Sequence, residues 1–151
     1  MKLQRKSNNS NHNSMKIGVI LTAAGQSRRF GGQSKPFVEL NSLPLFVNAL
    51  TPFLNQKDVV EIAITSNSDD QSRFHTCISE FIQTDIPISV VLGGETRRAS
   101  VEKAFKALTN SDVVMVHDAA RPMLNDALLS ALIDAAEIHQ AVIPGEPIRS
   151  E

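Results

Sequence analysis

Two hydrophobic periods alternate along this chain. Short apolar runs typical of buried strands are separated by longer stretches in which apolar residues recur every three or four positions, as on one face of a helix. The runs predict strands at 17–21, 59–65, 86–92 and 113–116, with a fifth beginning at 141–144. The stretches between them predict helices at 46–54, 68–83, 96–108 and 125–138. This alternation predicts an α/β fold, a mostly parallel sheet with helices on both faces.

The helical stretches carry signals at particular positions. Pro52 lies inside the first and is expected to bend or shorten it, and Asn125 is expected to cap the last. In the second and third helices one apolar stripe is expected to face the sheet. The stripe comprises Phe74, Ile78, Phe81 and Ile82 in the second helix and Val101, Ala104, Phe105 and Leu108 in the third.

The N-terminal segment differs from the rest of the chain. It is rich in asparagine and shows no apolar periodicity, which predicts a disordered tail over 1–14. Its basic residues raise the alternative of a plastid transit peptide, but the segment is short and Asn-rich, which favours a loose tail or a true start at Met15. Residues 15–151 are then expected to form one domain.

Composition narrows the classes of function. A net charge of −1 argues against general nucleic-acid binding, which needs a strongly basic face. The longest apolar run is far too short to span a membrane. Cys77 is the single cysteine, which excludes an internal disulfide and fits a reducing compartment, so a cytoplasmic location is expected. Its place in a helical pattern favours a packed thiol over a nucleophile.

The segment after the first expected strand carries the most distinctive chemistry. Residues 21–35 contain three glycines and three cations, and no Asp or Glu occurs between Lys16 and Glu39. Glycine turns let backbone N–H groups approach a phosphate. The spacing matches neither a P-loop nor a dinucleotide fingerprint. It suits nucleotidyl transfer, in which positioning and charge neutralisation dominate.

The cations of this segment are interpreted differently from one another. A solvated basic turn is favoured for Arg28 alone, and a functional role for Arg29 and Lys35, which have glycines between them. The whole segment points to a nucleoside triphosphate and to chemistry at its phosphates.

A second segment, Gly-Gly-Glu-Thr-Arg-Arg-Ala-Ser at 93–100, follows the third expected strand. Its paired glycines permit close backbone approach to a base or sugar, and Ser100 falls one turn into the next helix, within reach of a ligand. The alternative is a tight turn with a Thr96 helix cap and a solvated arginine pair.

The third segment, His-Asp-Ala-Ala-Arg-Pro at 117–122, follows the fourth expected strand. Asp118 ends an apolar strand, a common position for a carboxylate that binds a metal ion or a ribose. The planar guanidinium of Arg121 could bind a phosphate through two N–H groups. The alternative is an Asp118–Arg121 turn pair, and His117 is expected to fill space beneath the loop rather than to act as a base. Because ligands bind beyond the carboxyl ends of parallel strands, all three segments are expected at one edge of the sheet.

The order and spacing of these motifs resemble those of the 2-C-methyl-D-erythritol 4-phosphate cytidylyltransferase family. The resemblance lies in Ala-Ala-Gly-x-x-x-Arg at 23–29 with Lys35, in Gly-Gly-x-x-Arg-x-x-Ser-Val at 93–101, and in the run 117–122. It implies a Rossmann-like nucleotidyltransferase fold, CTP as co-substrate, a small sugar-alcohol phosphate as acceptor, and a homodimer. It also implies Mg²⁺, bound mainly through the CTP phosphates, with Asp118 as the candidate protein ligand.

Roles for individual residues follow from the same resemblance. Arg29 and Lys35 are expected to stabilise the charged transition state, and Asp118 and Arg121 to bind the substrate. The residues expected to bind CTP are Ala23, Ala24, Gly25, Gly94, Glu95, Ser100 and Ala119.

Three features depart from the family pattern. Thr22 stands where relatives often carry proline, and this change is expected to be harmless. Lys35 is flanked by Ser34 and Pro36, which predicts that its side chain points in a different direction from the lysine of family members. The chain ends at Glu151, before the arm that in the family crosses to the partner subunit, so an amino-terminal portion lacking its carboxy-terminal part is expected. The alternatives to the family reaction are a ribitol-5-phosphate cytidylyltransferase and a truncated CTP-binding remnant without catalysis.

Overall fold

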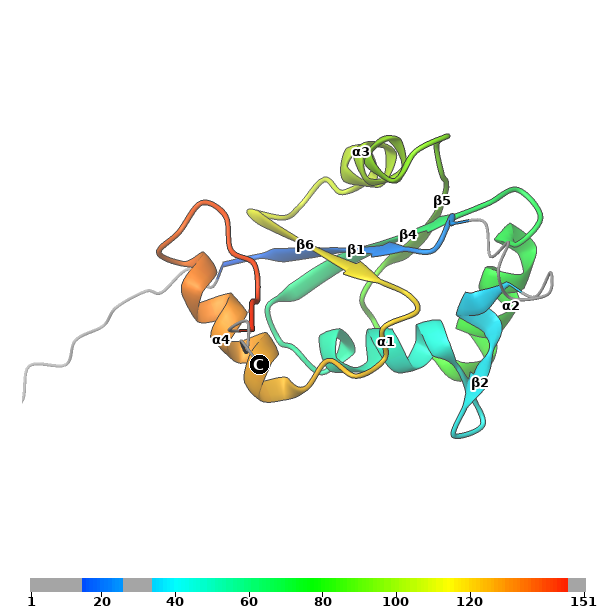
Figure 1. Cartoon of the computed structure of the whole chain (residues 1–151), viewed down its shortest axis with the longest axis horizontal. Coiled ribbons are helices and arrows are strands. Elements are labelled where there is room, and N and C mark those ends of the chain that lie inside the picture. Colours follow the sequence, from blue (N-terminus) through cyan, green and yellow to red (C-terminus); the bar gives the residue numbers. More distant parts are fainter. Residues whose placement is uncertain (1–14, 26–33, 147–151) are drawn as a thin grey trace, which may run out of the picture.

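Four parallel strands in the order β5-β4-β1-β6 form the central sheet (Figure 1). The computed structural model describes residues 15–25 and 34–146, so the tail at 1–14 lies outside the described residues. The strands are β1 (Ile17–Thr22), β4 (Val59–Ser66), β5 (Ile88–Leu92) and β6 (Val113–Asp118). The hydrophobic pattern does not predict the short antiparallel hairpin of β2 (Glu39–Leu40) and β3 (Leu43–Pro44).

Helices cover both faces of this sheet. They are the 3-10 turn η1 (Lys35–Phe37) and the helices α1 (Leu45–Leu54), α2 (Gln71–Phe81), α3 (Arg97–Ala107) and α4 (Asp126–Ala136). Helix α3 lies on one face, and α1 and α4 lie on the other (Figure 1). The α/β architecture expected from the sequence is therefore confirmed.

Strand β1 separates two layers of core, because successive side chains of a strand point to opposite faces. On one side, Val19 and Leu21 belong to a large cluster with the aromatic ring of Phe46. On the other side, Ile20 packs with Ala63 beneath α3. Burial on both faces explains why the run at 17–21 is continuously apolar rather than alternating.

Three expectations at the margins of the core are wrong. Phe105 is 58% exposed, because α3 packs through Ala104 and its neighbours while Phe105 projects about 100° further round the helix. Phe81 is 36% exposed at the last residue of α2. Residues 141–144 form no strand, and Ile143 is 88% exposed. An apolar run becomes a strand only by pairing its backbone, and among the described residues this run pairs with none.

Several local expectations hold with adjusted boundaries. Helix α2 begins at Gln71 rather than 68, because the Asn67 side chain accepts the N–H of Asp70 at 2.9 Å and forms a turn there. Asn125 caps α4 by accepting the N–H of Leu128 at 2.8 Å. Pro52 lies inside α1, which ends at Leu54.

Cys77 packs against the large core cluster, as a structural thiol does. Burial raises the pKa of its thiol, which disfavours the reactive thiolate. In the part of the chain that the structure describes, no helix is both long enough and apolar enough to cross a bilayer.

Glu61 is a buried carboxylate that the pattern of the sequence does not reveal. It lies on β4 with 8% of its surface exposed. Its two oxygens accept the N–H groups of Thr109 at 2.9 Å and Asn110 at 2.8 Å. Burial by itself would raise the pKa of Glu61, but the hydrogen bonds outweigh it and hold the pKa below its ordinary value of 4.5. Glu61 thus anchors the turn between α3 and β6.

We expect Glu61→Gln to lower the free energy of unfolding at pH 7 by about 1–3 kcal/mol, because the amide accepts only one of the two N–H groups. A lowered pKa contributes stability above the pKa of the unfolded chain, and this contribution is lost as the pH falls through the folded value. The difference between wild type and variant should therefore shrink below pH 4.5. Urea denaturation at pH 7 and at lower pH measures it, with the exposed Glu80→Gln as matched control. A difference that does not change with pH would contradict this role.

Candidate functional site

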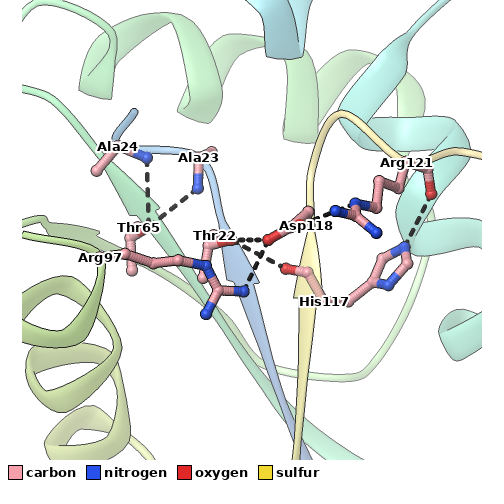
Figure 2. Close-up of polar contacts among 8 residues, drawn as sticks. All are labelled: Thr22, Ala23, Ala24, Thr65, Arg97, His117, Asp118 and Arg121. Atoms are coloured by element: carbon pink, nitrogen blue, oxygen red, sulfur yellow. Dashed lines mark hydrogen bonds and ion pairs between the residues drawn. The ribbon is translucent and has the colours of Figure 1, made fainter. Parts of the chain in front are cut away.

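The segments that follow β1, β5 and β6 meet at the carboxyl edge of the sheet, as the sequence predicts. They enclose a cleft of about 780 Å³. Its lining comprises Thr22, Ala24, Gly25, Thr65, Gly94, Glu95, Thr96, Arg97, Ser100, Asp118, Ala120 and Arg121. The structure therefore brings most of the expected site residues into one concave surface, and Figure 2 shows its polar contacts.

The turn after β1 is held by a residue that sequence reasoning missed. The hydroxyl of Thr65, at the end of β4, accepts the N–H of Ala23 at 3.0 Å and the N–H of Ala24 at 3.4 Å (Figure 2). The Ala23 N–H is thus already paired. Gly25 is exposed, and beyond its chain neighbours no atom of the described residues lies within 4 Å of the position that a Cβ would take there. A polar, β-branched residue near the carboxyl end of a mostly apolar strand is the signal that could have found Thr65.

The turn after β5 depends on its glycines because two loops pack closely there. A Cβ on Gly93 would lie 2.4 Å from the Cβ of Ala24, and one on Gly94 would lie 2.5 Å from the Cβ of Ala99. Neither distance leaves room for a methyl group. These glycines permit close packing within the protein, and the close approach to a base or sugar expected from the sequence stays a prediction.

Ser100 is 4% exposed and stabilises this turn from within α3. Its hydroxyl accepts the N–H of Gly94 at 3.0 Å and donates to the carbonyl of Thr96 at 3.0 Å. Thr96 also caps α3 by accepting the N–H of Ala99 at 3.0 Å. Ser100 therefore lines the cleft while its hydroxyl is bonded inside the loop, and Glu95 is exposed at the rim.

Asp118 is the centre of the charged part of the cleft (Figure 2). Its Oδ1 accepts from Arg97 Nη2 at 2.8 Å and from Thr22 Oγ1 at 2.7 Å. Its Oδ2 pairs with Arg121 Nε at 3.0 Å. The expected turn pair with Arg121 is therefore present, but Arg97 and Thr22 complete a network that spans three elements.

The electrostatics of this network follow from its geometry. Burial alone would raise the pKa of Asp118, but the hydrogen bonds from Arg97 and Thr22 and the charges of both arginines hold it below its ordinary value. The carboxylate is consequently ionised at neutral pH. The side chains of Arg97 and Arg121 are 64% and 77% exposed, so both guanidinium groups remain open to an anion. The contact between Arg97 and Asp118 is not predicted from the sequence, where a solvated arginine pair is the alternative interpretation.

His117 is directed away from the cleft. Its Nε2 lies 2.9 Å from the carbonyl oxygen of Arg121 (Figure 2). Its ring lies 5.5 Å from the ring of Phe53. It packs beneath the loop, in agreement with the sequence analysis.

Lys35 borders a second, smaller hollow of about 160 Å³ beside the cleft. The hollow is lined by Thr22, Ala23, Gly25, Lys35, Pro36, Ala119 and Ala120. Pro36 is buried in the first turn of η1, a position where a missing N–H costs nothing. Ala119, 1% exposed, forms the floor. Arg28 and Arg29 lie outside the described residues.

The described residues contain no group of three or more His, Cys, Asp or Glu side chains arranged to hold a metal ion. Asp118 is a carboxylate of the cleft, and both of its oxygens are engaged by arginines and Thr22. Asp118 would therefore have to exchange one of these partners to bind a metal ion, and the ion would have to bring most of its own oxygen ligands, as Mg²⁺ does when it is bound to phosphates.

Comparison with known proteins gives a consistent result. The family model of 2-C-methyl-D-erythritol 4-phosphate cytidylyltransferase matches residues 17–150. A protein of that name from Dehalococcoides mccartyi is 30% identical over 134 residues, which cover 89% of this chain and 59% of the relative. A bifunctional IspD/IspF enzyme from Bradyrhizobium diazoefficiens is 35% identical over 138 residues, which cover 89% of this chain and 34% of the relative.

Solved structures agree with the sequence matches. The 4-diphosphocytidyl-2C-methyl-D-erythritol synthase of Anaerococcus prevotii superposes with a TM-score of 0.69 at 26% identity, covering 82% of this chain and 52% of that one. The bifunctional IspDF of Campylobacter jejuni gives a TM-score of 0.66 at 28% identity, and the match covers 81% of this chain and 31% of that one. The chain thus spans 59% or less of the length of these curated relatives.

Proposed function

Because the chain belongs to the 2-C-methyl-D-erythritol 4-phosphate cytidylyltransferase family, we propose that it transfers CMP from CTP to 2-C-methyl-D-erythritol 4-phosphate. The products are 4-diphosphocytidyl-2-C-methyl-D-erythritol and pyrophosphate, in non-mevalonate isoprenoid biosynthesis. The observation that carries the proposal is the cleft in which Asp118, held by two arginines, lies in one wall and the glycine turn after β5 in another. In this proposal residues 15–151 form the CTP-binding unit.

The reaction asks the protein for alignment more than for covalent chemistry. A phosphate oxygen of the sugar alcohol attacks the α-phosphorus of CTP and forms a new P–O bond. The bond from that phosphorus to the bridging oxygen breaks, and pyrophosphate leaves with the electron pair. Because the attacking oxygen is already anionic, no protein nucleophile is required. Rate enhancement then comes from holding the two anions together and stabilising the charge of the transition state.

We assign this task to the cations at the cleft. Lys35 borders the hollow beside the turn after β1, so its ammonium group is proposed to contact the phosphates of CTP together with Arg29. The guanidinium of Arg121 is exposed and is proposed to bind the phosphate of the sugar alcohol. The ionised carboxylate of Asp118 accepts hydrogen bonds, so we assign it to substrate hydroxyl groups and to the orientation of both arginines.

The cytidine is proposed to lie along the turns that follow β1 and β5, because both turns line the cleft. Gly25 is open to the cleft, and Glu95 is exposed at its rim. Ala23 and Ser100 support this surface from below, since their polar groups are paired with Thr65 and Gly94. The other residues proposed to bind CTP are Ala24, Gly94 and Ala119.

We also propose Mg²⁺ as a requirement, carried by the CTP phosphates, with Asp118 as its candidate protein ligand. The ion would supply charge neutralisation between phosphate oxygens. Further proposals from the family resemblance are a homodimer for the full-length enzyme and a cytoplasmic location of the bacterial type. The single cysteine, which fits a reducing compartment, supports the latter.

Titration of CTP into the protein with Mg²⁺, followed by calorimetry, tests the proposal, with ATP as the matched nucleotide control. We expect heat with CTP and little with ATP. Pyrophosphate release should then require both CTP and 2-C-methyl-D-erythritol 4-phosphate.

Each other outcome has a defined meaning. The absence of heat at millimolar CTP would contradict any nucleotide function for this chain. Binding of CTP without turnover would favour the alternative of a CTP-binding remnant without catalysis. Equal turnover with ribitol 5-phosphate would favour a ribitol-5-phosphate cytidylyltransferase.

A further inference from the structure

Asp70 stands immediately before α2 but does not cap it. An aspartate at this position usually accepts an N–H of the first helical turn, yet its side chain makes no such bond. Instead its Oδ2 accepts from the hydroxyl of Ser34 at 2.7 Å and from Nδ2 of Asn67 at 2.7 Å. Asp70 is only 9% exposed. The buried carboxylate of Asp70 therefore accepts a hydrogen bond from a residue 36 positions away in the sequence.

Ser34 is the residue immediately before Lys35. Its carbonyl accepts the N–H of Phe37 at 3.1 Å, and the carbonyl of Lys35 accepts the N–H of Val38 at 3.1 Å. These bonds close the 3-10 turn η1 around Lys35. The position of Ser34 consequently sets where the backbone of Lys35 lies.

The other end of η1 is anchored to the same helix, α2. The ring of Phe37 lies 4.6 Å from the ring of Phe74 and 5.7 Å from that of Phe46. The guanidinium of Arg73 lies 4.2 Å above the Phe37 ring, a cation–π contact. Lys35 is thus held between a buried hydrogen bond on its N-terminal side and an aromatic cluster on its C-terminal side.

We infer that Asp70 is a positioning residue that, through Ser34, holds Lys35 in place for phosphate contact. The inference rests on the proposed function. A lysine side chain has a flexible four-carbon stem, so the position of its backbone sets the region that the ammonium group can reach. Misplacement of a reacting group by about 1 Å costs up to about 100-fold in rate. Loss of the bond between Ser34 and Asp70 should therefore lower kcat and leave CTP affinity nearly unchanged.

A double-mutant cycle between Ser34→Ala and Lys35→Ala tests the inference. We expect Ser34→Ala to lower kcat about tenfold, with the Kd for CTP unchanged within about twofold. In the Lys35→Ala background it should cause no further loss, because the group that it positions is gone. Ser34→Thr, which keeps the hydroxyl, should restore most of the rate. Ser68→Ala, which removes a hydroxyl bonded locally to Asp69 at 3.0 Å, is the matched control.

A second readout does not depend on turnover. In the wild type, CTP should slow the acetylation of Lys35 by trace acetic anhydride, measured by mass spectrometry, and in Asp70→Ala this protection should be largely lost. Circular dichroism melting checks that the variant is folded, and Ser34→Ala replaces it if it is not. An equal rate loss from Ser34→Ala with and without Lys35, or full protection of Lys35 in the variants, would overturn the inference. If the wild type neither transfers CMP nor binds CTP, it is the proposed function that fails.

Discussion

Replacing Lys35 with alanine should lower kcat for CMP transfer by about two to three powers of ten, or about 3 kcal/mol, the usual loss when one preorganised charge-stabilising group is removed. Lys35 lines the hollow beside the turn after β1, next to Thr22, Gly25 and Ala120. Its charge is proposed to act mainly on the crowded transition state. Steady-state measurement of pyrophosphate release should show the loss in kcat, with CTP binding less affected.

The matched control is Lys57→Ala. Lys57 is an exposed lysine in the turn between α1 and β4, at the opposite end of the sheet from the cleft. Its removal changes net charge by the same amount without touching the site. A wild-type rate in Lys35→Ala would refute the role proposed for this lysine. Equal losses in both variants would point to a general electrostatic effect instead.

Replacing Asp118 with asparagine should lower kcat/KM for the sugar-alcohol phosphate by about 10- to 100-fold, since a hydrogen bond to a charged group contributes about 1.5–3 kcal/mol. The amide has one oxygen in place of two, so it cannot serve Arg97, Thr22 and Arg121 together. The arginines would lose their fixed orientation. The Kd for CTP should change much less than kcat/KM for the acceptor.

The pH dependence offers an independent check of Asp118. Because its pKa is lowered, the wild-type carboxylate stays ionised down to acidic pH, and kcat/KM should show no titration of this group near neutrality. Asp134→Asn, an exposed aspartate on α4, is the matched control. A wild-type kcat/KM in Asp118→Asn would contradict the assignment of Asp118 to the substrate.

The sequence predicts the scaffold well because the scaffold is built from local periodicity. Strand β1, buried on both faces, is recognisable from its apolar run alone, and the start of α4 from its Asn125 cap. The apolar run at 141–144 shows the limit of this reasoning, because pairing depends on a neighbouring strand. Phe105 shows a similar limit, since the width of the buried stripe is set by what α3 packs against.

The site is predictable only in part for a related reason. Glycines and charged residues after strands identify the edge at which ligands bind, and Asp118, Gly94 and Lys35 all lie there. Thr65, by contrast, is chemically ordinary in the sequence. It becomes part of the site only because β4 lies beside β1.

By itself, the sequence determined the order of strands and helices, the segments expected to bind phosphates and the family resemblance. Each of these depends on residues that lie close together along the chain. The tertiary structure alone decided which distant side chains meet. It joined Arg97 to Asp118 across 21 positions and Asp70 to Ser34 across 36. Such contacts depend on how helices are placed against the sheet, and a charge or a hydroxyl acquires a specific partner only when folding removes water from between them.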